Sequence, residues 1–223
     1  IQGVVVFGFH RSILPDLNKL PVPFSCMTSR KIKNRVQTND KYFIEKIIEA
    51  AKQSGGRKLG IISSLRMVDE PVRSGEKDIK LFYNKLFSAL ENAGIENRPE
   101  WNGIARKCDK LLMNSEYDKF AFEAFQKVWS AKEKPDSIFV YTDDLTTGTI
   151  LSVACSKVKV PEELNLIFHH HYDSKIFCPL PCCYIQDNLR DMAKGLIDLV
   201  EDQFHGKEIS EVEVKYKLVK HQP

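Results

Sequence analysis

The chain has 223 residues, of which 43% are hydrophobic and 28% charged, which is ordinary for a globular protein with one large or two small domains. The formal net charge of +3 is too small to predict that this chain itself binds nucleic acid, and its apolar runs are too short to cross a bilayer. Six cysteines without regular spacing favour a reducing, cytoplasmic compartment.

The chain opens on a Val-rich strand, predicted over residues 3–8. Such a run is typical of a strand buried on both faces of a parallel sheet, which requires neighbouring strands. Because Ile1 is not an initiator residue and the strand comes at once, we expect the chain to be a fragment of a longer polypeptide.

Predicted helices and strands alternate along the rest of the chain. Helices are predicted where apolar residues recur at helical spacing, and strands where short apolar runs are bounded by turn residues. The basic residues 30–35 are interpreted as a solvated connection. Regular alternation predicts an α/β protein with parallel sheets. The predicted helices cover residues 13–20, 41–53, 78–93, 116–129, 148–156 and 189–204, and the further strands 22–27, 59–63, 137–141, 164–168 and 212–218, the last an edge strand.

Residues 134–171 form the most informative stretch. A predicted strand ends in Thr142-Asp143-Asp144, a helix follows, and a second strand ends in three histidines, 169–171. In open parallel sheets, ligands bind at the carboxyl ends of the strands. The sequence therefore predicts a ligand site at these polar strand ends.

The sequence lacks the motifs of several enzyme classes. No GxGxxG or P-loop follows a predicted strand, and neither a GxSxG elbow nor an HExxH pair occurs. We therefore expect no enzyme, no catalytic residues and no cofactor.

The acidic pair Asp143 and Asp144 could act as a general acid and base, but an acidic residue at a helix start also caps free N–H groups. We favour capping. The histidines, with Cys178, Cys182 and Cys183 nearby, raise a metal hypothesis. Neighbours on a strand point to opposite faces, so only the first and third histidines share one, and the cysteines lack paired CxxC spacing. We expect no metal site.

The order and spacing of several segments resemble the effector-binding core of LacI/GalR-type transcription regulators. The resemblance runs through almost the whole chain, although each motif alone is degenerate. It rests on Gly3 to Val6, Leu20 to Phe24, Val36 to Asp40, Pro135 to Asp143, Gly148, Val160-Pro161-Glu162-Glu163 and Cys183-Tyr184-Ile185-Gln186.

This resemblance implies a type I periplasmic-binding-protein-like fold, in which two α/β lobes are joined by three crossovers and a ligand cleft lies between them. It places residues 1–38 and 187–206 in lobe one, and residues 39–186 and 207–223 in lobe two. The DNA-binding head and the N-terminal part of lobe one would then be absent from this chain.

The resemblance also implies ligand positions, several of which depart from the family pattern. The Asp and Arg with which the family commonly holds sugars are replaced, so a typical sugar effector is disfavoured. Thr142 stands where the family often has Asn, and His170 stands where it has the first Asp of a pair. The implied ligand-binding residues are Phe7, Cys26, Lys80, Phe82, Thr142, Asp143, His170 and Gln186.

We therefore expect the effector-binding and dimerisation domain of a bacterial LacI-type repressor. A small polar effector would bind between the lobes, and the protein would be a cytoplasmic homodimer that reaches operator DNA through the absent head and contacts no membrane. The alternative is a solute-binding protein of a sugar transporter, which would share this fold.

Overall fold

The computed structural model describes residues 2–7, 13–28, 32–65, 74–105, 114–171, 177–207 and 211–223. The chain divides into two compact units, the first made of Ile1–Phe43 with Asp187–Tyr216 and the second of Ile44–Gln186 with Lys217–Pro223. The chain therefore passes between the units three times. Residues 39–43 and 207–216 belong to the first unit, whereas the resemblance assigns them to lobe two.

The first unit contains a parallel sheet with the strand order β1-β2-β3-β9. β1 lies at the edge of this sheet, and Val5 is half exposed. Arg35, interpreted as part of a solvated connection, instead begins β3 and is buried. The strands are β1 (Val4–Val6), β2 (Phe24–Met27), β3 (Arg35–Thr38) and β9 (Glu211–Val214).

Helices α6 (Leu189–Phe204) and α1 (Leu14–Leu17) pack against this sheet. Alternate residues of β2 point to opposite faces. Ser25 donates a 2.7 Å hydrogen bond to the Leu196 carbonyl oxygen of α6, whereas Phe24 and Cys26 pack with Leu17 of α1. The two apolar faces of the sheet are thus covered by different helices.

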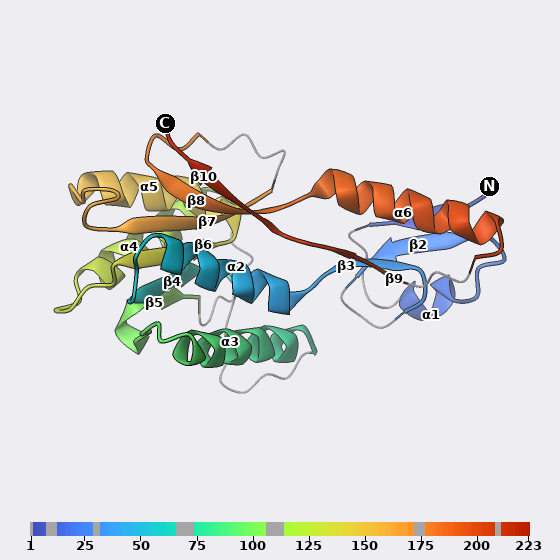
Figure 1. Ribbon diagram of the computed structural model, residues 1–223, viewed down its shortest axis with the longest axis horizontal. Helices are drawn as coiled ribbons and strands as arrows, with labels where there is room; N and C mark the ends of the chain where they lie inside the picture. Colours follow the sequence, from blue (N-terminus) through green and yellow to red (C-terminus); the bar gives the residue numbers. More distant parts are fainter. Residues whose placement is uncertain are drawn as a thin grey trace. The chain divides into compact units, whose positions relative to one another are not determined.

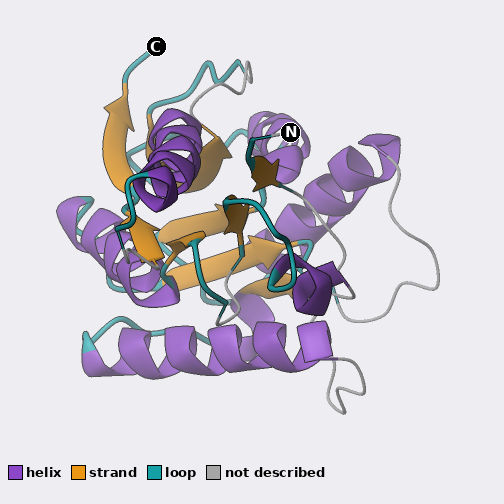
Figure 2. Ribbon diagram, turned by 90° about the vertical axis from the view of Figure 1, so that its right-hand side faces the viewer, coloured by secondary structure: helices purple, strands orange, loops and turns teal. Residues whose placement is uncertain are grey.

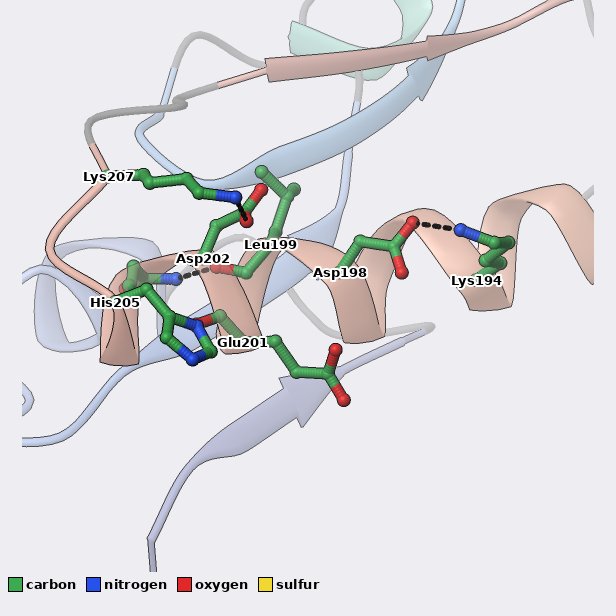
Figure 3. A network of polar contacts seen from close by, with 8 residues as sticks. Lys194, Asp198, Leu199, Glu201, Asp202, His205 and Lys207 are labelled. Carbon is green, nitrogen blue, oxygen red and sulfur yellow. Dashed lines mark hydrogen bonds and ion pairs between the residues drawn. The ribbon is translucent and has the colours of Figure 1, made fainter.

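Asn188 caps the start of α6, since its side-chain oxygen accepts hydrogen bonds from two backbone N–H groups of the first turn. The solvent-facing side of the helix is charged (Figure 3). There, Lys194 lies 2.5 Å from Asp198, and Lys207, just beyond the helix, lies 2.7 Å from Asp202. The helix is therefore amphipathic, with one face in the core and one in water.

The second unit contains a six-stranded sheet with the order β10-β8-β7-β6-β4-β5 (Figure 1). β4 pairs in parallel with β5 and β6, and β6 pairs in parallel with β7, whereas β10 is antiparallel to β8. The strands are β4 (Leu59–Ser63), β5 (Asn102–Ile104), β6 (Ser137–Tyr141), β7 (Asn165–His171), β8 (Cys182–Asp187) and β10 (Lys217–His221).

Helices pack against the strands as expected for an α/β architecture (Figure 2). Two of them, α4 and α5, lie side by side, and their buried side chains share a core with Ile138, Val140 and Phe168 of the central strands. The helices associated with this sheet are α2 (Asp40–Gln53), α3 (Ser74–Asn92), α4 (Asn114–Trp129) and α5 (Thr146–Cys155), with single 3-10 turns η2 (Pro99–Trp101) and η3 (Asp143–Leu145).

The α/β class with parallel sheets is confirmed. The predicted strand 212–218 is in fact two strands, because β9 joins the first sheet and β10 the second. β3, β5 and β8 were not predicted. Of the described helices, none has the length and apolar character needed to cross a membrane.

Candidate ligand site

Polar residues of the second unit gather where three neighbouring parallel strands end. Ser64 follows β4, Thr142 and Asp143 follow β6, and residues 169–171 end β7. Because β4, β6 and β7 run in parallel, their carboxyl ends meet at one edge of the sheet. This edge is the candidate ligand site.

Thr142 connects two of these strand ends. Its Oγ1 lies 3.3 Å from Ser64 Oγ and donates a 3.3 Å hydrogen bond to Asp144 Oδ2. The backbone N–H of Ser64 also donates to the Tyr141 carbonyl oxygen. The hydroxyl pair is partly exposed and can donate to or accept from a ligand hydroxyl.

Asp143 does not serve as the predicted helix cap. The N-cap positions are Thr142 for η3 and Leu145 for α5, and neither side chain makes a capping hydrogen bond. Asp143 lies one residue inside η3, and its Oδ1 is 3.9 Å from His171 Nε2 on the neighbouring strand. Its carboxylate therefore belongs to the strand-end cluster.

A row of rings runs from helix α3 across β6 to β7. The centroids of Phe82 and Tyr141 lie 5.9 Å apart, those of Tyr141 and His169 5.0 Å, and those of His169 and His171 5.0 Å. The ring contacts of His169 with Tyr141 and with His171 are edge-to-face, with interplanar angles of 85°. This packing fixes the orientation of the first histidine ring.

His170 points to the opposite face of β7. Its ring lies 4.6 Å from that of Tyr184, and Gln186 Nε2 lies 3.4 Å from its Nδ1. The structure thus brings together two of the predicted ligand residues, His170 and Gln186, but on the other side of the strand from His169 and His171.

The remaining predicted residues are distributed over both units. Phe82 is buried on α3 against the ring of Tyr141, and Lys80, two residues earlier, is partly exposed. Phe7 and Cys26 lie in the first unit. Phe7 is 62% exposed, whereas Cys26 is fully buried and burial raises the pKa of its thiol. Of these two, only Phe7 presents its side chain at the surface of its unit.

The side chains of Asp143, His169 and His171 form a group that sequence reasoning missed. One potential ligand atom from each lies within 4.8 Å of the others. The signal was available, because two histidines with i, i+2 spacing share one face of a strand and Asp143 follows the adjacent parallel strand. Sequence reasoning paired the histidines with the cysteines instead.

The cysteines form a separate cluster near the β8 end of the sheet. Cys178 Sγ and Cys182 Sγ lie 3.9 Å apart, and both side chains are buried. The hydrogen bond from Cys182 lowers the pKa of Cys178 to about 6, and the same bond, with burial, raises the pKa of Cys182. His221 Nε2 contacts the Cys178 carbonyl oxygen at 2.8 Å. Cys108 lies outside the described residues.

A hollow of about 600 Å³ lies between the C-terminal half of α3 and β5. It is lined by Phe87, Leu90, Pro99 and Ile104, among others, and by none of the predicted ligand residues. It lies at the β5 edge of the sheet, and its lining does not include Ser64, Thr142, Asp143 or residues 169–171.

No family model matches the sequence. Among curated proteins, the chain is 29% identical over 134 residues to the uncharacterized HTH-type transcriptional regulator YkvZ of Bacillus subtilis, covering 59% of this chain and 37% of that protein. It is 24% identical over 143 residues to the HTH-type transcriptional repressor CytR of Escherichia coli, covering 61% and 38%. The chain thus spans less than two fifths of the length of these curated relatives.

Two solved structures show the fold. A LacI family transcription regulator from Clostridium acetobutylicum superposes with a TM-score of 0.71 at 14% identity, covering 98% of this chain and 77% of that one. The Escherichia coli repressor ascG superposes with a TM-score of 0.70 at 13% identity, covering 98% and 76%. This chain has the LacI-type fold.

These comparisons confirm the expected resemblance to LacI/GalR-type regulators. They also confirm the expected α/β, periplasmic-binding-protein-like fold class. The similar curated proteins are transcription regulators and not enzymes, in keeping with the expected absence of catalysis. For the same reason, the alternative of a transporter's solute-binding protein is not favoured.

Proposed function

We propose that this chain is the effector-binding and dimerisation region of a bacterial LacI-type transcription regulator. The observation that carries the proposal is the set of polar side chains at the carboxyl ends of β4, β6 and β7 within a LacI-type fold. In such sheets this edge is where ligands bind. The curated relatives, which are HTH-type regulators, support the regulatory role.

The effector is a small polar molecule held partly by rings. Thr142 and Ser64 offer hydroxyl groups, Asp143 a carboxylate, and His170 with Gln186 an imidazole and an amide. A ligand that leaves these groups without partners would lose affinity, because desolvated polar atoms need hydrogen bonds. We propose that Lys80 and Phe82, both on α3, also contact the effector.

Regulation follows from differential affinity. An effector shifts the equilibrium between two arrangements of the units only as far as it binds one arrangement more tightly than the other. We propose that the regulator is a cytoplasmic homodimer, because a two-fold operator is read by two symmetric copies. An HTH-type head, as in the names of the curated relatives, would make the DNA contact.

A thermal-shift screen of the chain against sugars, nucleosides and amino acids tests the proposal. A ligand that binds only the folded state raises the melting temperature, by an amount that grows with concentration above its Kd. Thr142→Val should weaken the best hit by about tenfold, since it removes one hydrogen bond at the site.

Thr147→Val is the matched control, because Thr147 is the second residue of α5 and its side chain is exposed. It should leave the affinity of the hit unchanged. If His170→Ala and Thr142→Val both bound the hit as tightly as the unmodified chain, the ligand site would lie elsewhere.

A further inference from the structure

We propose that Asp143, His169 and His171 form a binding site for a divalent transition-metal ion of the zinc class. The site lies wholly within the second unit, and the proposal does not depend on the regulatory function proposed above.

The donor set fits such an ion. Two imidazoles and one carboxylate suit zinc, nickel, copper or ferrous iron, whereas calcium and magnesium prefer oxygen ligands alone. Zn²⁺ commonly takes three protein ligands of this kind and keeps one position open for water or another ligand. The group has the composition of an open site and not of a closed structural one.

The sheet itself brings the three residues together. His169 and His171 have i, i+2 spacing on β7, so their side chains point to the same face. The register pairs Val140 of β6 with Phe168 of β7, which places Asp143 and His171 the same number of residues beyond that pair. The chain turns into η3 directly after β6, and the carboxylate faces the histidines.

The present distances require only a small adjustment. The three ligand atoms lie within 4.8 Å of one another, and Asp143 Oδ1 is 3.9 Å from His171 Nε2. Bonds of about 2.0–2.2 Å in a tetrahedral arrangement place ligand atoms about 3.4 Å apart. The largest separation exceeds this by up to about 1.4 Å, which small rotations of the three side chains can close.

Burial is graded across the group. His169 is buried, the side chain of Asp143 is 12% exposed, and that of His171 is 43% exposed. An ion could therefore enter past His171 and be held against the two inner ligands. The edge-to-face contact of Tyr141 with His169 keeps the inner imidazole in place, as supporting residues do around metal ligands.

The test is a titration of the purified, chelator-treated chain with Zn²⁺ in a calorimeter, and with Co²⁺ followed by visible absorption. We expect stoichiometric binding by the unmodified chain. Each of the variants Asp143→Asn and His171→Gln should weaken it by at least about tenfold. His205→Gln is the control, because His205 is an exposed histidine at the end of α6, and it should bind as the unmodified chain does.

The Cys178–Cys182 pair is the competing place for a soft metal, and Cys178→Ser distinguishes it. Absence of stoichiometric binding by the unmodified chain would overturn the proposal. So would affinity that survives both Asp143→Asn and His171→Gln, or that is lost only in Cys178→Ser. Circular dichroism of each variant separates loss of the metal site from loss of the fold. Whether the unmodified chain binds Zn²⁺ stoichiometrically tests the proposal even if a variant does not fold.

Discussion

Gly148→Ala should destabilise the second unit, because there is no room for a methyl group where α5 crosses α4. A Cβ at this position would lie 2.1 Å from the carbonyl oxygen of Asp118 and 2.8 Å from its carbonyl carbon and Cα. These are backbone atoms of α4, so no side chain can rotate away. The two helices would have to move apart.

The expected cost follows from two opposing effects. Overpacking of this kind costs about 1–3 kcal/mol, and a clash with backbone belongs at the upper end of that range. Ala in place of Gly in a helix returns about 1 kcal/mol through helix propensity. The net loss should therefore be about 2 kcal/mol in the free energy of unfolding.

Tryptophan fluorescence during urea unfolding measures this loss. The chain has two tryptophans, Trp101 and Trp129, and both lie in the second unit, so the signal reports that unit alone. With a urea slope of about 2 kcal/mol/M, the midpoint should fall by about 1 M. Thr147→Ala, an exposed neighbour in the same helix, is the control and should leave the midpoint unchanged or slightly raised. A Gly148→Ala midpoint equal to that of the control would refute the argument.

Asn188→Ala removes the N-cap of α6 and should destabilise the first unit by about 1 kcal/mol. The backbone amides of α6 should then exchange faster, and an unchanged exchange rate would contradict the prediction. Glu211→Ala removes the carboxylate that lies 2.7 Å from Arg35 Nη2. Because the side chain of Glu211 is half exposed, the loss in free energy of unfolding should be about 1–2 kcal/mol, measured by amide exchange in β3. The pKa of the Cys178 thiol is lowered from its ordinary 9.0 to about 6 in the folded chain. Between pH 6 and pH 9 the folded state therefore binds fewer protons than the unfolded state, and the free energy of unfolding should rise with pH over this range. Cys178→Ser should flatten this part of the pH profile of the urea midpoint, whereas an identical profile would show that the thiolate hydrogen bond with Cys182 contributes nothing.

The elements that sequence reasoning located best are those whose apolar pattern is unambiguous. Helix α6 and strands β4 and β6 have their predicted bounds, because each is a clean periodic or continuous apolar run. β5 is only Asn102–Ile104, and β8 contains two cysteines and two polar residues, so neither carries a strong strand pattern. β9 and β10 lie in one alternating apolar run in the sequence. The run is divided because its first part pairs with β3 and its second part pairs with β8, which the apolar pattern alone does not indicate.

The strand ends were predictable as a location but not as a set of contacts. Parallel topology predicted that the residues after β6 lie near the histidines, and the structure shows this for Asp143. Which face each histidine occupies depends on where β7 begins and ends, and this strand extends to His171, three residues beyond its predicted end. The i, i+2 spacing already places His169 and His171 on one face, but only the register of β6 against β7 shows that Asp143 lies beside them.

The place of β9 has a consequence for synthesis on the ribosome. β3 is made early, yet its outer neighbour β9 is about 175 residues further along the chain, after nearly all of the second unit. The second unit, by contrast, is almost continuous in sequence. During translation, most of the larger unit can therefore assemble while the earlier-made sheet still has an open edge at β3, and this edge is covered only when β9 is made, shortly before the edge strand β10 of the second unit.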